Sequence, residues 1–154
     1  MNIKKTANLL INFTIKRISE IIGIIIFASG ILLITALLTY SPEDPNFIFP
    51  DNTEIKNILG FQGSFVSDLF FQSIGLISYL FSLTLILTGI NIFRQKDIFQ
   101  IIESLFYITI YSLIGSIFFN YFHSNSLNLY INGNGGFIGN YLGQTLINDL
   151  ISSN

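Results

Sequence analysis

The sequence predicts an all-α integral membrane protein, with three transmembrane helices followed by a C-terminal, glycine-striped helix that is interfacial or partly re-entrant. Composition supports the membrane class, because 51% of the residues are hydrophobic and only 10% are charged, against about a quarter charged in soluble proteins. The length of three apolar stretches supports it as well. A helix rises about 1.5 Å per residue and the hydrocarbon core of a bilayer is about 30 Å thick, so about 20 apolar residues cross it.

The apolar stretches and their connections divide the chain, which we treat as a single membrane domain. The expected order is a cytoplasmic tail (1–18), a first span (20–40), a periplasmic loop (41–65), a second span (68–93), a cytoplasmic turn (94–97), a third span (98–119), a periplasmic loop (120–134) and an interfacial helix (135–151).

The first span follows a basic tail and ends before two prolines. No Asp, Glu, Lys or Arg lies between Glu20 and Glu43. Pro42 and Pro45 cannot continue a helix, and Tyr40 suits the headgroup level of a bilayer. A cleavable secretory signal has a shorter apolar run of about 7–15 residues and a small-residue cleavage site. No such site precedes Tyr40, so we expect a retained signal anchor.

The second span follows a loop in which we expect a short helix. Residues 54–59 have helical character, and Gly60 is a suitable residue to end that helix. No charged residue lies between Asp68 and Arg94. Because the positive end of the helix dipole favours a carboxylate, we expect Asp68 to cap the start of the second span.

The third span contains one ionisable residue, Glu103. A charge at the centre of a span costs about 2.5–3.5 kcal/mol on the translocon scale and is a functional candidate by default. Glu103 lies close to the start of the span, however, where this cost falls. We expect an interfacial or helix-paired carboxylate, with a contact or proton-linked role as the alternative.

The distribution of basic residues predicts the orientation in the membrane. Only Lys56 lies in the loop 41–65. The other six Lys and Arg residues lie in the tail or the turn: Lys4, Lys5, Lys16, Arg17, Arg94 and Lys96. Cytoplasmic loops carry an excess of Lys and Arg, so we expect the N-terminus and the turn in the cytoplasm.

The C-terminal region combines a turn-rich loop with regularly spaced glycines. His123, the only histidine, has no acidic or cysteine neighbours that would complete a metal site, so we expect an exposed interfacial residue. Gly135, Gly139 and Gly143 repeat every four residues and would form a close-packing seam on a helix, although each glycine costs about 1 kcal/mol against alanine. A flexible loop is the alternative.

Three phrases occur in order around these segments. Residues 36–47 read ALLTYSPEDPNF, residues 57–68 read NILGFQGSFVSD and residues 135–139 read GGFIG. Together with the basic tail, they resemble the N-terminal membrane domain of the FtsK/SpoIIIE DNA translocases. In that family a fourth span, a linker and an ATP-driven motor follow, and the sequence stops at residue 154, where the fourth span is expected to begin.

The resemblance implies a membrane anchor for a hexameric DNA pump at the division septum. It implies self-association and contacts with septal membrane proteins as well as with the lipid bilayer. The interaction candidates are residues of these phrases together with the last glycine of the repeat: Tyr40, Pro42, Asp44, Pro45, Phe47, Leu59, Gly60, Gly63, Asp68, Gly135, Gly136, Gly139 and Gly143.

The chain itself is expected to have no catalytic, cofactor or metal site. A P-loop requires a Gly-Lys pair, and the sequence contains none. Cysteine is absent, which excludes thiolate metal sites. We also expect no contact with nucleic acid, because no basic face is evident.

Two alternatives remain open. In a small membrane transport or channel subunit, Glu103 and the glycine helix would line a pathway, and Glu103→Gln would abolish a flux without affecting assembly. An anchor would instead tolerate changes at Glu103 and be sensitive at Pro42, Asp44 or Pro45. The second alternative is a gene fragment without an independent role.

Overall fold

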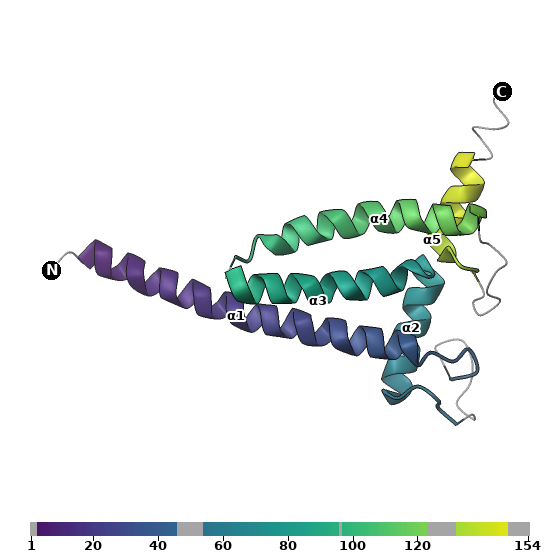
Figure 1. The fold of residues 1–154 in the computed structure, drawn as a ribbon, viewed down its shortest axis with the longest axis horizontal. Helices are drawn as coiled ribbons and strands as arrows, with labels where there is room; N and C mark the ends of the chain where they lie inside the picture. Colours follow the sequence, from purple (N-terminus) through teal and green to yellow (C-terminus); the bar gives the residue numbers. More distant parts are fainter. Residues whose placement is uncertain (1–2, 46–53, 96, 123–131, 148–154) are drawn as a thin grey trace.

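The computed structural model describes residues 3–45, 54–95, 97–122 and 132–147, and the regular elements in these ranges are all helices (Figure 1). The elements are α1 (Ile3–Leu38), α2 (Gly60–Ile74), α3 (Ile77–Gln95), α4 (Gln100–Phe122), α5 (Gly136–Leu142) and the π-helix η1 (Gly143–Ile147). The all-α fold class is therefore confirmed.

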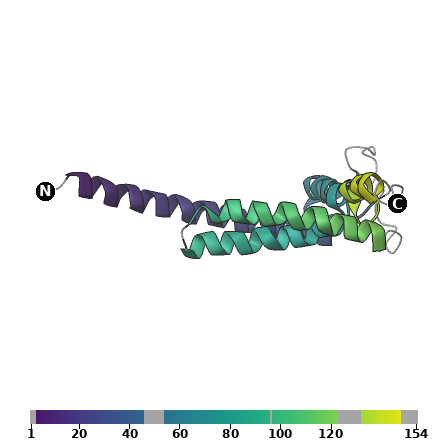
Figure 2. The ribbon, with the colours of Figure 1, turned by 90° about the horizontal axis from the view of Figure 1, so that it is seen from above.

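Three helices run side by side and are long and apolar enough to cross a membrane (Figures 1 and 2). They are Asn8–Leu38 of α1, Ile77–Gln95 and Gln100–Phe122. The chain reverses direction between consecutive spans, and α3 lies between the other two. Among the described residues, α1 and α4 do not contact one another.

Helix α1 is longer than the span predicted within it. Its 36 residues correspond to about 54 Å, so its N-terminal part projects past the end of α3 (Figure 1). The predicted tail 1–18 is helical from Ile3 onward. No proline or glycine precedes Gly23, so nothing local interrupts the helix.

The second predicted span, 68–93, is wrong as a single helix. Its first part belongs to α2, and the chain bends at Gly75 before α3 begins at Ile77. Gly75 has a φ of +63°, and a Cβ there would overlap the carbonyl of Asn134. The bend therefore depends on a positive φ, which glycine adopts readily, and on close contact between Gly75 and the backbone of Asn134.

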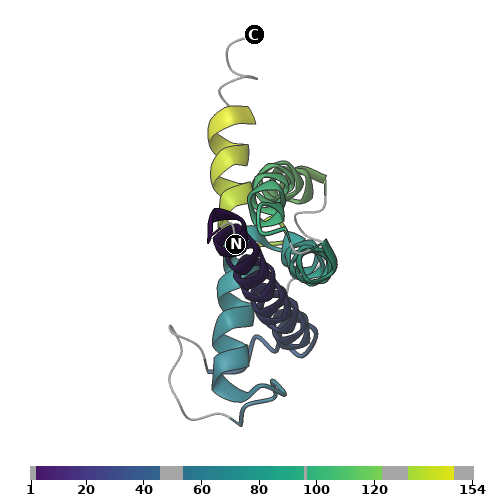
Figure 3. The same cartoon turned by 90° about the vertical axis from the view of Figure 1, so that its left-hand side faces the viewer.

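A layer of short helices lies across one end of the three spans (Figure 3). It comprises α2, α5 and η1, and we call these three elements the collar. The short helix expected at 54–59 is wrong, because helix begins only at Gly60. The described part of the predicted helix 135–151 is divided between α5 and η1, and residues 148–151 lie outside the described residues.

Spans α1 and α3 pack closely through glycines, which we call the α1–α3 seam: Gly23, Gly30 and Gly89. A Cβ at Gly23 would lie 2.8 Å from the backbone nitrogen of Phe93, and one at Gly89 would lie 2.7 Å from the carbonyl oxygen of Gly23. Small residues of this kind allow helix backbones to approach in lipid. Toward the collar, Leu33, Leu37 and Phe71 form the hydrophobic core.

Candidate functional site

The first two sequence phrases meet where α1 ends and α2 begins. Their polar side chains form one buried cluster, which we call the α1–α2 junction: Tyr40, Asp44, Asn57, Ser64 and Asp68. Three of these side chains, Asp44, Asn57 and Ser64, are at most 4% exposed. A buried polar group is costly unless it is hydrogen-bonded, so the partners of each residue determine what the cluster does.

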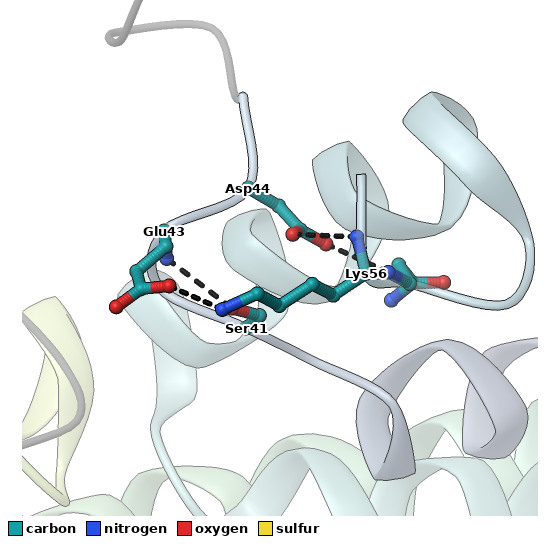
Figure 4. A network of polar contacts seen from close by, with 5 residues as sticks. Ser41, Glu43, Asp44 and Lys56 are labelled. Carbon is teal, nitrogen blue, oxygen red and sulfur yellow. Dashed lines mark hydrogen bonds and ion pairs between the residues drawn. The ribbon is translucent and has the colours of Figure 1, made fainter. Parts of the chain in front are cut away.

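Asp44 organises the connection between the two helices (Figure 4). It is only 1% exposed. Its Oδ1 accepts a hydrogen bond from the backbone N–H of Lys56, and its Oδ2 accepts one from the backbone N–H of Asn57, both at 2.8 Å. One carboxylate therefore ties the segment after α1 to the segment before α2.

Asn57 continues the connection in both directions. Its Nδ2 donates to the carbonyl of Ala36 at 2.9 Å, and its Oδ1 accepts the backbone N–H of Leu59 at 3.0 Å. The carbonyls in the last turn of a helix lack partners within the helix, so Asn57 satisfies one of those of α1. Gly63 is required beside it, because a Cβ at Gly63 would overlap Asn57 Oδ1.

Gly60 provides the turn into α2. It has a φ of +68°, in the left-handed region that favours glycine. Its N–H donates to the carbonyl of Asn57 at 2.9 Å. Nothing lies within 4 Å of a Cβ built at Gly60, so conformation and not space explains this glycine.

The remaining junction contacts fasten α2 to the end of α1. Tyr40 donates its hydroxyl to Asp68 Oδ1 at 3.0 Å, and Ser64 donates to the carbonyl of Pro45 at 3.1 Å. Asp68 does not cap a helix as expected. The span begins only after Gly75, so Asp68 lies in the second half of α2 and not at the start of a span. Its side chain is 8% exposed and accepts the hydroxyl of Tyr40.

Glu43 and Lys56 form an exposed ion pair beside the junction (Figure 4). The hydrogen bond from Lys56, and then its charge, lower the pKa of Glu43 below its usual value of 4.5. The same hydrogen bond and charge raise the pKa of Lys56 above 10.5. Because both groups are fully exposed, solvent screens this pair.

The third phrase packs against α4 and the bend at Gly75. Gly136 has a φ of +65°, and a Cβ there would lie 2.6 Å from the backbone nitrogen of Gly75. A Cβ at Gly135 or at Gly139 would overlap the carbonyl of Ser116, and one at Gly143 would lie 2.6 Å from Asn120 Nδ2.

A backbone hydrogen bond fastens the same region to the start of α3. Leu76 donates its N–H to the carbonyl of Asn134 at 2.9 Å. The described candidate residues from all three phrases therefore lie at the collar end of the spans.

Other predicted positions are not part of this cluster. Glu103 is exposed in the first turn of α4, and the glycines contact α4 near Asn120, about 25 Å away along the helix. Glu103 and the glycines therefore lie at opposite ends of α4. Pro42 is exposed on the connection, and Phe47 and His123 lie outside the described residues.

The cluster holds backbone and helices together and has no arrangement typical of catalysis. Within the described ranges, no three His, Cys, Asp or Glu residues lie close enough to hold a metal ion. Two structural features were not predicted from the sequence: the α1–α3 seam and the bend at Gly75. The separation of Gly23 and Gly30 by two helical turns was a usable signal for the seam.

Comparisons with known proteins cover the part of the chain that contains these residues. The family model for the 4TM region of DNA translocase FtsK/SpoIIIE matches residues 15–151. The DNA translocase FtsK of Pseudomonas putida is 33% identical over 81 residues, which are 52% of this chain and 10% of that protein. That of Rickettsia bellii is 30% identical over 78 residues, 51% of this chain and 10% of the relative.

A third relative, the DNA translocase FtsK of Rhizobium meliloti, is 27% identical over 96 residues, which are 62% of this chain and 11% of that protein. The chain thus spans about a tenth of the length of the curated relatives it matches. The family match lies on their membrane region and not on an ATPase motor. No solved structure matches.

Proposed function

The chain belongs to the family of 4TM regions of the DNA translocases FtsK/SpoIIIE, and on this premise we propose that it is a non-catalytic anchor that holds a DNA translocase in the bacterial inner membrane at the division septum. One observation carries the proposal. The polar residues of the first two phrases are used to join helices at the collar end, through bonds such as those of Asp44 and Asn57. Such a cluster supports a scaffold and leaves no group for chemistry.

The proposed orientation has the N-terminus in the cytoplasm and the collar on the periplasmic side. Arg94 lies in the last turn of α3, at the end opposite the collar. Arg17 lies on α1 near the same level, since Gly23 of α1 faces Phe93. At the collar end, Lys56 is the only Lys or Arg among the described residues. This bias of the basic residues agrees with the positive-inside rule.

The connection between α1 and α2 is the proposed contact surface for septal membrane proteins. Pro42 and Glu43 are exposed there, while Asp44 and Pro45 are buried and hold the connection in place. A rigid connection loses less conformational entropy when a partner binds. Self-association through the lipid-facing sides of the spans is the second proposed contact.

A localisation experiment tests this function. A fluorescent fusion of the chain, expressed in dividing bacterial cells, is expected to be enriched at division sites. Asp44→Ala should spread the fluorescence around the envelope, because the buried N–H of Asn57 loses its acceptor. Glu103→Gln is the control, since this exposed residue lies in the first turn of α4, at the end of the spans opposite the collar, and it should keep the enrichment. Even distribution of the unaltered chain would contradict the septal role.

A further inference from the structure

The collar is almost uncharged although much of its surface is exposed. Asp68 is the only charged residue in α2, α5 and η1, and it is buried against Tyr40. Large apolar side chains are exposed instead, among them Phe61 (47%), Leu69 (53%) and Phe137 (58%). Helices that lie in the plane of a bilayer bury apolar side chains such as Phe and Leu at the boundary between headgroups and acyl chains, and the exposed apolar residues of the collar are of this kind.

Two aromatic pairs strengthen this interpretation. Phe61 and Phe65 stack on α2 with ring centroids 6.4 Å apart, and Phe137 and Tyr141 stack on α5 at 5.9 Å. Tyr141 is 58% exposed. Tyrosine is enriched at the level of the headgroups, because its ring is apolar and its hydroxyl is polar, and the three Phe rings supply apolar area at the same level.

The collar also creates two apolar hollows against the spans. The larger, of about 390 Å³, lies between α2, α3, α4 and α5, and its lining includes Leu69, Phe70, Phe81, Ile108, Leu113 and Ile138. The smaller, of about 320 Å³, lies between α1 and α2 and is lined by residues that include Leu32, Leu33, Ala36 and Val66. Both hollows have span residues as walls and collar residues at one end.

The walls of the hollows are continuous with the surface that the spans present to lipid. Only Ile108, Ser112 and Ser116 of α4 are buried, so most of this helix faces outward. Leu32 on α1 and Leu113 on α4 are exposed and also line a hollow. Both hollows are therefore open to the surface of the spans that a bilayer would cover.

We propose that the collar is an in-plane lipid-binding layer, with its aromatic side chains in the headgroup region and an acyl chain of a bilayer phospholipid seated in each hollow. The hollows are apolar, so acyl chains are the part of a lipid that fits them. The proposal concerns the placement of this chain in a bilayer and is independent of the septal role.

Tryptophan fluorescence provides a direct test, because the sequence contains no tryptophan. The full chain is reconstituted in vesicles of phosphatidylcholine and phosphatidylglycerol, with acyl chains brominated either near the headgroup or near the terminal methyl. Leu69→Trp and Val66→Trp report on the two hollows. Ile110→Trp, on the exposed middle of α4, is the lipid-facing reference, and Lys56→Trp, on the polar connection, is the reference outside the bilayer.

The proposal predicts that Leu69→Trp and Val66→Trp are quenched as strongly as Ile110→Trp. Both should respond most to bromine near the headgroup, whereas Ile110→Trp should respond most to bromine near the terminal methyl. Phe61→Trp replaces an exposed aromatic residue and keeps the test open if a hollow variant fails to fold. It should be quenched by the shallow bromine as well.

Two outcomes would overturn the proposal. Tryptophans in the hollows and at Phe61 that are quenched no more than Lys56→Trp would place the collar in water. The second outcome is that another copy of the chain fills the larger hollow. Leu69→Trp would then be quenched weakly, and Leu69→Cys would form disulfide-linked dimers in the vesicles, since the sequence has no other cysteine.

Discussion

The α1–α3 seam and the α1–α2 junction hold the same helix, α1, in opposite ways. In the seam, glycines bring two helix backbones together, as where a Cβ at Gly89 would lie 2.7 Å from the carbonyl oxygen of Gly23. In the junction, buried side chains such as Asp44 and Asn57 bond to backbone groups at the helix ends. The seam uses shape and the junction uses hydrogen bonds.

The difference follows from what each environment leaves unsatisfied. Inside a span, every backbone N–H and C=O is already paired within the helix, so close packing is what remains to be gained. At the ends of α1 and α2, backbone groups lack helical partners. Polar side chains are needed there, and each must be matched. Substitutions should therefore fail through missing partners in the junction and through excess volume in the seam.

The largest effect is expected at the junction for Asp44→Ala. Two backbone donors lose their acceptor, and that of Asn57 is buried. We expect a loss of about 3 kcal/mol in the free energy of unfolding, since each hydrogen bond to a charged group contributes about 1.5–3 kcal/mol. Unfolding by SDS in mixed micelles measures this loss.

Trypsin cleavage tests the same substitution locally, at the connection between α1 and α2. Lys56 is the only trypsin site between the first two spans, and its backbone is fixed by Asp44. Asp44→Ala should therefore speed cleavage after Lys56 more than Asp44→Asn, which keeps one carbonyl acceptor. Equal cleavage rates in the variants and the unaltered chain would show that Asp44 does not hold the connection.

In the seam, Gly89→Ala should cost less, about 1–3 kcal/mol for overpacking. The new Cβ would meet the backbones of Phe27 and Gly23, which cannot move aside without separating the helices. Gly115→Ala is the matched control in another span, because its Cβ would meet only the side chain of Ile77. Alanine favours a helix by about 1 kcal/mol over glycine, so Gly115→Ala should be neutral or stabilising in the same SDS titration.

If both alanine variants behave alike, backbone proximity does not distinguish the two glycines. The seam would then be a looser contact than the structure indicates, and the contrast with the junction would weaken.

The two glycines Gly75 and Gly115 also show how far sequence reasoning reaches. Each is an isolated glycine in an apolar run, yet Gly115 lies within a continuous helix and Gly75 ends one. The three spans were predictable because length and apolarity are local properties. The bend was not, because Gly75 takes its left-handed conformation against Asn134, which is far along the chain.

The junction was predictable in part. The family phrases indicated which residues belong together, and the structure places Asp44, Asn57 and Asp68 in one cluster. The role of Asp68 was misjudged, since a carboxylate at the start of an apolar run is typical of a helix cap. Its actual partner, Tyr40, lies 28 positions earlier in the sequence, and no local pattern reports such a pairing.

A smaller effect is expected at this Tyr40–Asp68 contact. Tyr40→Phe removes the hydroxyl that Asp68 accepts at 3.0 Å. The loss should be about 1 kcal/mol, as for a typical buried hydrogen bond. A double-mutant cycle with Asp68→Asn isolates the contact, because residues that bond directly show a coupling energy of about 0.5 kcal/mol or more. Additive losses would mean that the two side chains act separately.

The smallest loss of stability is expected when the exposed ion pair between Glu43 and Lys56 is removed. The pH dependence of this loss distinguishes it from the other effects. The pKa of Glu43 is lowered, so its contribution to stability is present above 4.5 and is lost as the pH falls through the lowered value. The pKa of Lys56 is raised, so its contribution is present below 10.5 and is lost as the pH rises through the raised value.

Glu43→Gln should therefore be slightly less stable than the unaltered chain between these limits and equally stable outside them. Added salt should reduce the difference, because exposed charges are screened. SDS unfolding of both proteins across this pH range, at low and high salt, measures it. A difference that persists below the lowered pKa of Glu43 would mean that the side chain acts through packing and not through charge. The exposed edge of the junction would then resemble the seam, where shape decides stability.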